Sequence, residues 1–262
     1  MGNPENMTFD GHLYVLRKMM MRITISICIL TILIFYFKEY VWNIILAPSS
    51  SNFIFFRVLH KIIILYSPNE QMEIFSVKLI NTELSSQFMV HLSTSFYIGL
   101  LLDSPHIFME FFLFVKPALY KNEIKSTIFL TIIGYLLFLF GILLNYFIIF
   151  PMCFRFLSSY QVSTSILNMI NLSSYVSTFI TLSLAMGLVF ETPIIAFFSA
   201  KIGIISADFL KEYRKWAVVI ITILSAIITP PDVFSCFMMM IPLLILYEFS
   251  IIIVSHVERK QP

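Results

Sequence analysis

The chain has 262 residues, of which 59% are hydrophobic and only 12% are charged, and its mean hydropathy is +0.90. Soluble domains are close to half apolar and a quarter charged, so this composition excludes a soluble globular domain and indicates an integral membrane protein. The net charge of +2 gives no support for nucleic-acid binding. The cysteines Cys28, Cys153 and Cys236 are odd in number and far apart, which favours neither a disulfide framework nor a zinc site. We expect no metal ion and no cofactor.

The N-terminal segment is first polar and then basic. Its first twelve residues contain no Lys or Arg but do contain Glu5 and Asp10, so they resemble neither a secretory signal nor an Arg-rich transit peptide. For a protein of an organelle, this pattern predicts synthesis inside that organelle. Arg17, Lys18 and Arg22 directly precede the first apolar run, where a basic helix start at the inner membrane interface is expected.

Six apolar runs are candidates for membrane spans, which need about 20 residues each. The fifth has an apolar core of only 13 residues, Trp216 to Ile228, which is about 20 Å of helix. This helix is expected either to extend into residues 211–215 or to cross a locally thin membrane. The pattern predicts an all-α integral membrane protein with six transmembrane helices, forming one membrane domain over residues 1–262. The expected spans are residues 23–40, 84–102, 126–150, 172–200, 213–228 and 233–254.

The lysines and arginines indicate the orientation of these spans. If the N-terminus lies inside, 12 of the 17 basic residues fall in inner segments, and membrane proteins carry such an excess on the side of synthesis. Both termini are therefore predicted to face the cytoplasm, the matrix or the stroma. The inner set consists of Arg17, Lys18, Arg22, Lys116, Lys121, Lys125, Lys201, Lys211, Arg214, Lys215, Arg259 and Lys260.

Besides the short turn between the last two spans, two longer outer segments join the spans. The longer covers residues 42–83 and includes Pro48 near its start. Within it, residues 53–66 form an apolar stretch with a basic strip that is too short to span the bilayer, which predicts a helix lying on the outer membrane surface. The second outer segment, residues 151–170, is expected to be a loop with a polar tract.

The inner segment at residues 103–125 contains Pro105 and Pro117 as expected breaks in helix. The lysines in the second half of this segment are explained by the excess of basic residues that membrane proteins carry on the inner side. This excess explains neither Glu123 nor the aromatic run that ends at Phe114. This segment is therefore a candidate binding surface.

Glu191 lies inside the fourth apolar run, and Pro193 follows two positions later. A carboxylate in a membrane costs a few kcal/mol unless it is paired, protonated or in contact with water. The proline also leaves a nearby backbone carbonyl without its helical donor. Two roles are open for Glu191, namely contact with another protein or a proton relay in transport.

The last two runs are joined by only four residues, Thr229, Pro230, Pro231 and Asp232. The prolines should end the first helix, because proline has no amide proton and disfavours helix in the residue before it. Asp232 should cap the next helix, because its carboxylate accepts from the free amides of a helix start. A turn this short makes the two helices antiparallel neighbours.

This last hairpin resembles that of TatC, the multispanning subunit of the twin-arginine protein translocase. The resemblance is carried by the turn TPPDVFS, by the apolar stretch with a proline that follows, and by the pair Tyr247-Glu248 near the helix end. It covers nearly the whole chain in the same order. The family commonly has Gln where this chain has Cys236.

The inner segment is similar to the family block F-x-x-P-A-L-Y-x-x-E. The resemblance implies that its glutamate recognises the twin arginines of a signal peptide, which suits the preference of guanidinium for a bidentate carboxylate partner. The matching positions are Phe114, Pro117, Ala118, Leu119, Tyr120 and Glu123.

The segment before the first span resembles the family block H-L-x-E-L-R-x-R and matches it at His12, Leu13, Leu16 and Arg17. It departs at Val15, where the family has a second carboxylate for the signal peptide, and at Met19, where a basic residue is usual. The loss at Val15 halves the negative charge available to hold two arginines.

The resemblance implies three sets of functional residues. The first binds the signal peptide, the second forms a polar face in the membrane where small single-span partner subunits dock, and the third shapes the fold. The signal-peptide set is Arg17, Phe114, Pro117, Leu119, Tyr120 and Glu123. The docking set is Glu191, Thr229, Asp232 and Cys236. The structural set is Pro48, Pro230, Pro231, Tyr247 and Glu248.

The implied function is that of a non-catalytic core and receptor subunit that moves folded precursor proteins across the bilayer. The proton-motive force is the expected energy source, since the sequence has no phosphate-binding Gly-Lys-Ser/Thr loop. Its implied partners are TatA/TatB-like subunits, signal peptides, lipid and further copies of this chain. The alternative is a proton-coupled solute transporter with Glu191 as the proton site, which would usually show inverted repeats that we do not find.

The location is expected to be the mitochondrial inner membrane. Val15, the absence of a leader and the abundance of Ile and Phe favour it. The alternatives are the plastid thylakoid membrane and the bacterial plasma membrane.

Overall fold

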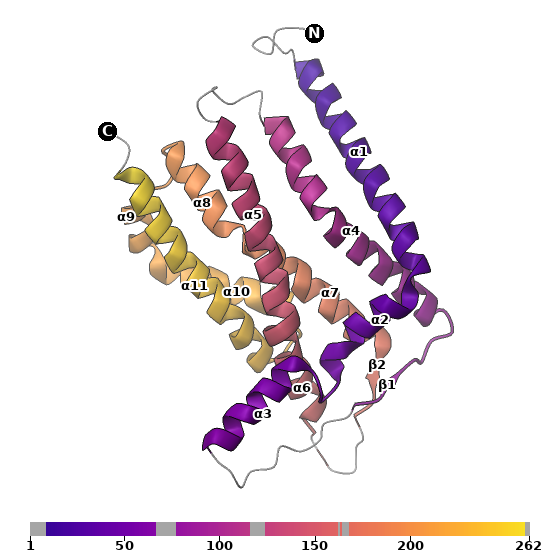
Figure 1. Ribbon diagram of the computed structural model, residues 1–262. Helices are drawn as coiled ribbons and strands as arrows, with labels where there is room; N and C mark the ends of the chain where they lie inside the picture. The colour runs from indigo at the N-terminus through magenta and orange to yellow at the C-terminus, as the bar shows by residue number, and fades with distance from the viewer. Residues whose placement is uncertain (1–8, 67–76, 116–123, 162, 164–167, 260–262) are drawn as a thin grey trace. The chain divides into compact units, whose positions relative to one another are not determined.

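The computed structural model describes residues 9–66, 77–115, 124–161, 163 and 168–259, and it confirms the predicted all-α class for these ranges (Figure 1). Two short strands, β1 (Leu79–Ile80) and β2 (Ile170–Asn171), pair in parallel. The helices are α1 (Phe9–Tyr36), α2 (Lys38–Leu46), α3 (Ile54–Tyr66), α4 (Ser86–Val115), α5 (Ile124–Leu144), α6 (Phe150–Ser159), α7 (Leu172–Val189), α8 (Thr192–Lys201), α9 (Ala207–Glu212), α10 (Arg214–Ile228) and α11 (Val233–Glu258).

Five helical segments among the described residues are long and apolar enough to cross a membrane. They correspond to five of the six predicted spans, so the chain is a multi-pass membrane protein. The prediction that both termini lie on one side stays a prediction. The segments are Leu13–Tyr36, Ser86–Phe114, Ile128–Ser159, Leu172–Lys201 and Val233–Glu258.

The remaining predicted span corresponds to α10, which has 15 residues. This helix is about 22 Å long at 1.5 Å per residue, whereas a hydrocarbon core is about 30 Å thick. The expected extension into residues 211–215 adds only Arg214 and Lys215, because α9 ends at Glu212 and forms a separate helix. The second expectation, a locally thin membrane, stays a prediction.

Pro105 does not end α4, so its expected role as a break is wrong. The helix continues for ten residues to Val115. A proline within a helix removes the donor for the carbonyl four residues earlier, which here belongs to Leu101. The hydroxyl of Ser104 donates to that carbonyl at 2.6 Å. The freed acceptor is therefore satisfied, as a helix in a membrane requires.

The second outer segment is also more helical than expected. After α5 the chain forms a π-helical turn (Asn145–Ile149) and then α6, so residues 151–159 are helix and not loop. Pro151 lies in the first turn of α6, where a missing amide breaks no bond within the new helix. The helix predicted to end at residue 150 thus continues through a wider turn into α6.

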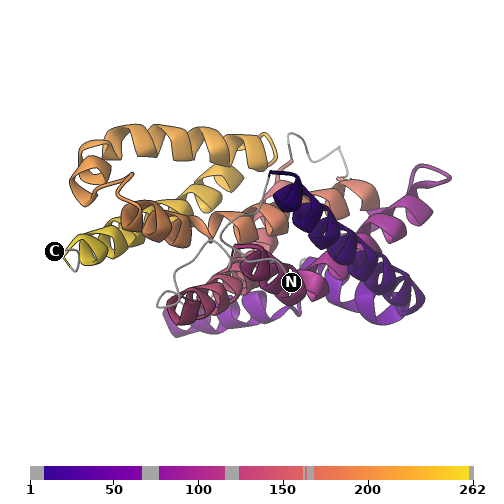
Figure 2. The same ribbon diagram turned by 90° about the horizontal axis from the view of Figure 1, so that it is seen from above.

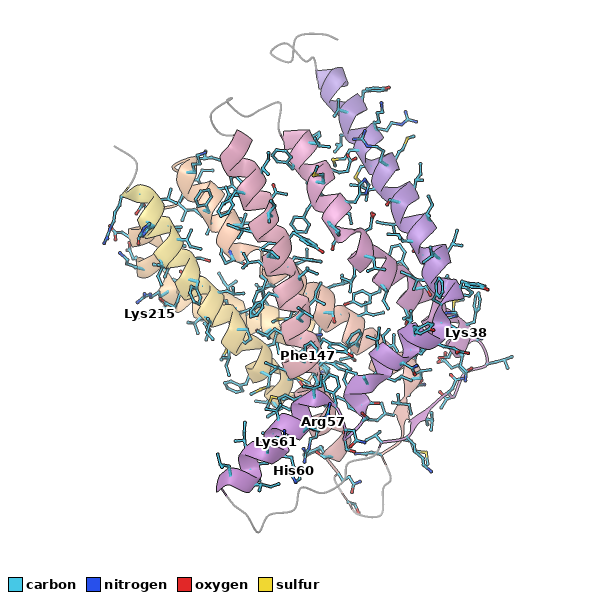
Figure 3. All side chains as sticks on the ribbon, viewed as in Figure 1. Lys38, Arg57, His60, Lys61, Phe147 and Lys215 are labelled. Atoms are coloured by element: carbon cyan, nitrogen blue, oxygen red, sulfur yellow. The ribbon has the colours of Figure 1, made fainter. Side chains whose placement is uncertain are left out.

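The first predicted span was placed at residues 23–40, but α1 begins at Phe9 and ends at Tyr36. A second helix, α2, begins at Lys38. The helix predicted at residues 53–66 is found as α3, and its place on the outer membrane surface stays a prediction. Figure 3 shows its basic side chains, Arg57, His60 and Lys61. The apolar side chains of Ile54, Val58 and Ile62 are exposed at spacings of four, which suits a helix that lies on a bilayer.

The chain divides into two compact units. The first comprises residues 1–41 and 88–136, and the second residues 42–87 and 137–262. In the first unit α1 meets α4 at Gly99, where a Cβ atom would lie 2.8 Å from Thr31 Oγ1 and 3.1 Å from Thr31 N. A side chain at position 99 would therefore force Thr31 to shift. The prediction of a single membrane domain stays a prediction.

In the second unit α11 packs against α8 and α10, and these helices lie side by side in both views (Figures 1 and 2). The core of this unit contains Met186 of α7 together with Met239 and Leu246 of α11. Gly141 of α5 lies against α7, because a Cβ atom there would be 2.6 Å from the carbonyl oxygen of Met186. Tightly packed helices with small residues at close approaches are typical of membrane bundles.

Candidate functional site

The predicted signal-peptide site is described only in part. Arg17 is exposed on α1, and Phe114 is half-buried near the end of α4. Both belong to the first unit. The other predicted residues lie outside the described residues, so their roles stay predictions. They are Pro117, Leu119, Tyr120 and Glu123.

The first unit contains a polar network that joins α1 to α4. Arg22 Nη2 donates to Glu110 Oε2 at 2.5 Å. The side chain of Arg22 is 46% exposed, whereas that of Glu110 is 8% exposed. One turn further along α1, the hydroxyl of Ser26 donates to the carboxylate of Asp103. A buried carboxylate is stable only when it is paired and hydrogen-bonded, and these partners satisfy that condition for one oxygen of each acid.

His106 lies between the two acids on α4. Its Nδ1 is 3.3 Å from Asp103 Oδ1, and its Nε2 is 3.6 Å from Glu110 Oε1. Asp103 is only 2% exposed, and its second oxygen, Oδ2, is buried without a hydrogen-bond partner among the described residues. The arrangement is an acidic site that one guanidinium occupies. Within the described ranges no group of three acidic, His or Cys side chains could hold a metal ion.

The sequence reasoning missed this network. A signal was available, because Asp103, His106 and Glu110 are spaced by three and by four residues directly after the second predicted span. Such spacing places side chains on one helix face. The expectation that Pro105 ends the helix concealed the periodicity.

Glu191 lies where the fourth span is interrupted. Helix α7 ends at Val189 and α8 begins at Thr192, so Glu191 is in the break between them. Pro193 leaves the carbonyl of Val189 without its helical donor, and the hydroxyl of Thr192 donates to that carbonyl. The backbone is therefore satisfied, but Glu191 Oε1 is buried without a hydrogen-bond partner in the part of the chain that is described.

The surroundings of Glu191 are apolar. Its neighbours Phe190 and Pro193 line a pocket of about 360 Å³. The rest of the lining comes from α5 and α11, including Leu144, Pro242 and Phe249. A carboxylate beside an apolar pocket in a membrane is costly unless another group pairs with it.

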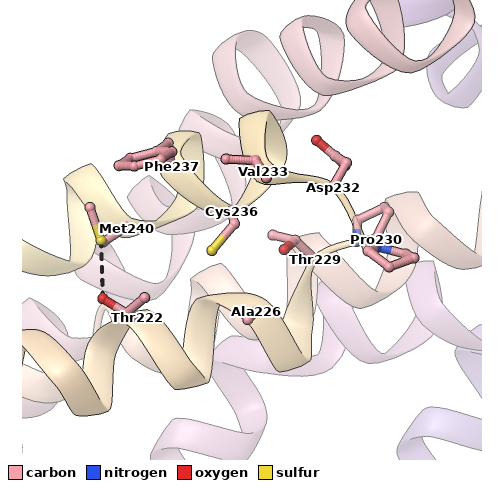
Figure 4. Close-up of a pocket in the computed structure, with 10 residues that line it drawn as sticks. Thr222, Ala226, Thr229, Pro230, Asp232, Val233, Cys236, Phe237 and Met240 are labelled. Atoms are coloured by element: carbon pink, nitrogen blue, oxygen red, sulfur yellow. Dashed lines mark hydrogen bonds between the residues drawn. The ribbon is translucent and has the colours of Figure 1, made fainter. Parts of the chain in front are cut away.

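The last hairpin has the predicted local structure. Helix α10 ends at Ile228, and Asp232 caps α11 by accepting from Ser235 N at 2.6 Å. Thr229, Asp232 and Cys236 come together at one pocket of about 480 Å³ between the two helices (Figure 4). Its lining consists of Thr222, Ala226, Thr229, Pro230, Pro231, Asp232, Val233, Cys236, Phe237 and Met240. Glu191 is not part of this lining.

Two of the predicted structural residues connect the last helix to its neighbours. The hydroxyl of Tyr247 donates to the carbonyl of Leu210 at 2.7 Å. Glu248 accepts from Arg214 at 2.7 Å, in an ion pair whose two side chains are each 51% exposed. Pro48 is buried in a short 3-10 turn after α2. The hydroxyl of Tyr175 donates to the carbonyl of Ile45 beside that turn at 2.8 Å.

Comparison with known proteins gives a consistent result. The family model for the Sec-independent protein translocase protein (TatC) matches residues 11–242. A Sec-independent protein translocase protein TatC from Blattabacterium sp. subsp. Periplaneta americana is 36% identical over 266 residues, which cover 100% of both chains. One from Campylobacter jejuni is 34% identical over 248 residues, covering 94% of this chain and 93% of that protein.

A solved structure is also similar to this fold. The crystal structure of a twin arginine translocase receptor, TatC, superposes with a TM-score of 0.74 and 31% sequence identity. The match covers 95% of this chain and 100% of that structure.

Proposed function

This chain belongs to the TatC family of Sec-independent protein translocase proteins, and we propose that it receives signal peptides on one helix pair and docks small partner subunits on another. As a member of this family it is a core subunit of the translocase that moves folded proteins across a membrane with the proton-motive force. Because the chain belongs to this family, the function of a translocase subunit is favoured over that of a proton-coupled solute transporter. The family is one of transport components, and the chain itself is proposed to be non-catalytic.

The proposed signal-peptide surface combines Arg17 and Phe114 with the inner loop that carries Glu123. An aromatic and aliphatic surface suits the apolar part of a signal peptide, and a carboxylate suits its arginines. Further residues of this surface are Pro117, Leu119 and Tyr120.

The test is crosslinking of a radiolabelled twin-arginine precursor to the protein in membrane vesicles. Glu123→Ala should abolish the crosslink while the protein still inserts. Glu212→Ala is the matched control, since Glu212 is an exposed glutamate on α9. Crosslinking of Glu123→Ala at the level of the parent protein would refute the assignment.

The proposed docking surface for a single-span subunit contains Glu191. The observation that carries this proposal is the buried oxygen Oε1, which has no hydrogen-bond partner among the described residues. A polar side chain on an incoming transmembrane helix would complete its hydrogen bonding, and such a bond is favoured in a bilayer where water is absent. The apolar pocket beside it would receive the apolar side chains of the same helix. Thr229, Asp232 and Cys236 form a second proposed contact, at the pocket of the last hairpin.

Glu191→Ala should leave precursor crosslinking intact and reduce co-purification with a TatA/TatB-like subunit. Loss of both activities together would indicate a role in folding and would contradict the docking assignment. Thr181→Ala, at another polar position of α7, is the matched control, because this exposed hydroxyl lies away from the helix break.

The named relatives are bacterial, which supports the bacterial plasma membrane as the location. The mitochondrial inner membrane, expected from the sequence, has no support from these relatives. Assembly of several copies with partner subunits belongs to the same proposal.

A further inference from the structure

The ion pair between Arg22 and Glu110 is unequal in its exposure. Glu110 is 8% exposed and lies between α1 and α4, whereas Arg22 is 46% exposed and reaches it from the surface. The guanidinium therefore occupies an acidic site that is open on one side. Arg22 can leave this site for water, but Glu110 cannot.

The site lies next to the proposed signal-peptide surface. Glu110 and Phe114 are four residues apart on α4, so they share one face of the helix, one turn apart. On α1, Arg22 and Val15 are seven residues apart and also share a face. Val15 carries no charge, so this face of α1 offers no carboxylate at that position. The described carboxylate beside Arg22 is that of Glu110 on α4.

The charge of the site favours an additional cation. Asp103 and Glu110 supply two carboxylates, and Arg22 supplies one permanent positive charge. His106 contacts both acids at 3.3 and 3.6 Å. Asp103 Oδ2 is buried with no hydrogen-bond partner in the described part of the chain, and its residue is 2% exposed. An unsatisfied carboxylate oxygen beside an occupied one is able to accept a second donor group.

We propose that Glu110 binds a guanidinium of the signal peptide, and that Arg22 is the resident occupant which the incoming arginine displaces. The proposal rests on the proposed function of receiving signal peptides. Exchange of one guanidinium for another preserves the buried charge pair, so Glu110 is never left unpaired. Lysine would replace Arg22 less well, because an ammonium lacks the planar fork that matches a carboxylate.

The experiment measures binding of a fluorescent synthetic signal peptide with an Arg-Arg pair to the full-length protein in detergent. Arg22→Gln removes the competitor and should tighten binding about threefold to fivefold, since a half-exposed ion pair contributes little. Glu110→Gln removes the acceptor and should weaken binding about tenfold, as expected for a charge-assisted hydrogen bond. A purely structural ion pair would predict weaker binding for both variants. Opposite signs therefore support the proposal, and equal signs or no change in either variant overturn it.

Two further variants guard against misfolding. Arg22→Lys keeps the charge and should bind the peptide with an affinity between those of the parent and Arg22→Gln; weaker binding than the parent overturns the proposal. Arg214→Gln breaks an ion pair of similar length in the second unit and should leave peptide binding unchanged. A peptide with Lys-Lys in place of Arg-Arg should bind the parent and Arg22→Gln with the same affinity.

Failure of this inference is distinguishable from failure of the proposed function. If the parent protein binds the peptide and Glu123→Ala weakens binding, the proposed signal-peptide surface is supported. The Arg22 and Glu110 variants then decide only the role of Glu110. If the parent does not bind the peptide, both are overturned.

Discussion

Replacing Glu191 by leucine should make the isolated protein more stable and less able to bind its partner. The carboxylate lies in the break between α7 and α8, and its Oε1 is buried without a hydrogen-bond partner among the described residues. In the absence of a partner subunit, burial removes water from this oxygen and no described residue replaces the lost hydrogen bonds. Leucine has no such atom, and its apolar side chain suits a position whose neighbours Phe190 and Pro193 line an apolar pocket.

The magnitude follows from the one unsatisfied oxygen. A buried polar atom without a partner costs about 1–3 kcal/mol, so Glu191→Leu should raise the free energy of unfolding by about this amount. For a chain of this length that is an increase in apparent Tm of about 2–6 °C. Loss of the same atom should weaken association with a single-span subunit about tenfold or more, because the bond it would form there is charge-assisted.

The assay is thermal unfolding in one detergent at a fixed scan rate, followed by co-purification with the partner subunit. Thr192→Val is the control, because it removes the hydroxyl that satisfies the carbonyl of Val189 and should lower the apparent Tm. If Glu191→Leu is less stable than the parent, the carboxylate has a partner within the chain, and the reasoning about an uncompensated acid is refuted.

Three other substitutions test the fold through the same apparent Tm. Gly99→Val should destabilise the protein by about 1–3 kcal/mol through overpacking against Thr31; an unchanged Tm would mean that α1 and α4 are not in close contact there. Ser104→Ala should cost about 1 kcal/mol by leaving the carbonyl of Leu101 unsatisfied beside Pro105, whereas no loss would show that another group satisfies it. Asp232→Ala should cost about 1 kcal/mol by removing the cap of α11, and equal stability would show that the cap is dispensable.

Features that depend on neighbouring residues were predictable from the sequence. The turn at Thr229 to Asp232 was predicted with its cap, because proline and an N-cap carboxylate act within a few residues of their own position. Pro105 was predicted wrongly for an informative reason. Its effect depends on whether the freed carbonyl finds a donor, and here the adjacent Ser104 supplies one.

The functional residues divide in a similar way. Glu191 was identified because a carboxylate in an apolar run is costly wherever that run folds. The ion pair of Arg22 with Glu110 joins residues 88 positions apart, and no local pattern states which basic residue will meet which acid.

The sequence by itself determined that this chain crosses a membrane several times, where its last hairpin turns, and to which family it belongs. These properties follow from hydropathy, from proline chemistry and from short motifs, all of which act locally. The tertiary structure decided which acids are paired and which are left unsatisfied. That outcome depends on the close approach of helices distant in the chain, as at Gly99 and Thr31, which brings side chains within hydrogen-bonding distance only after packing.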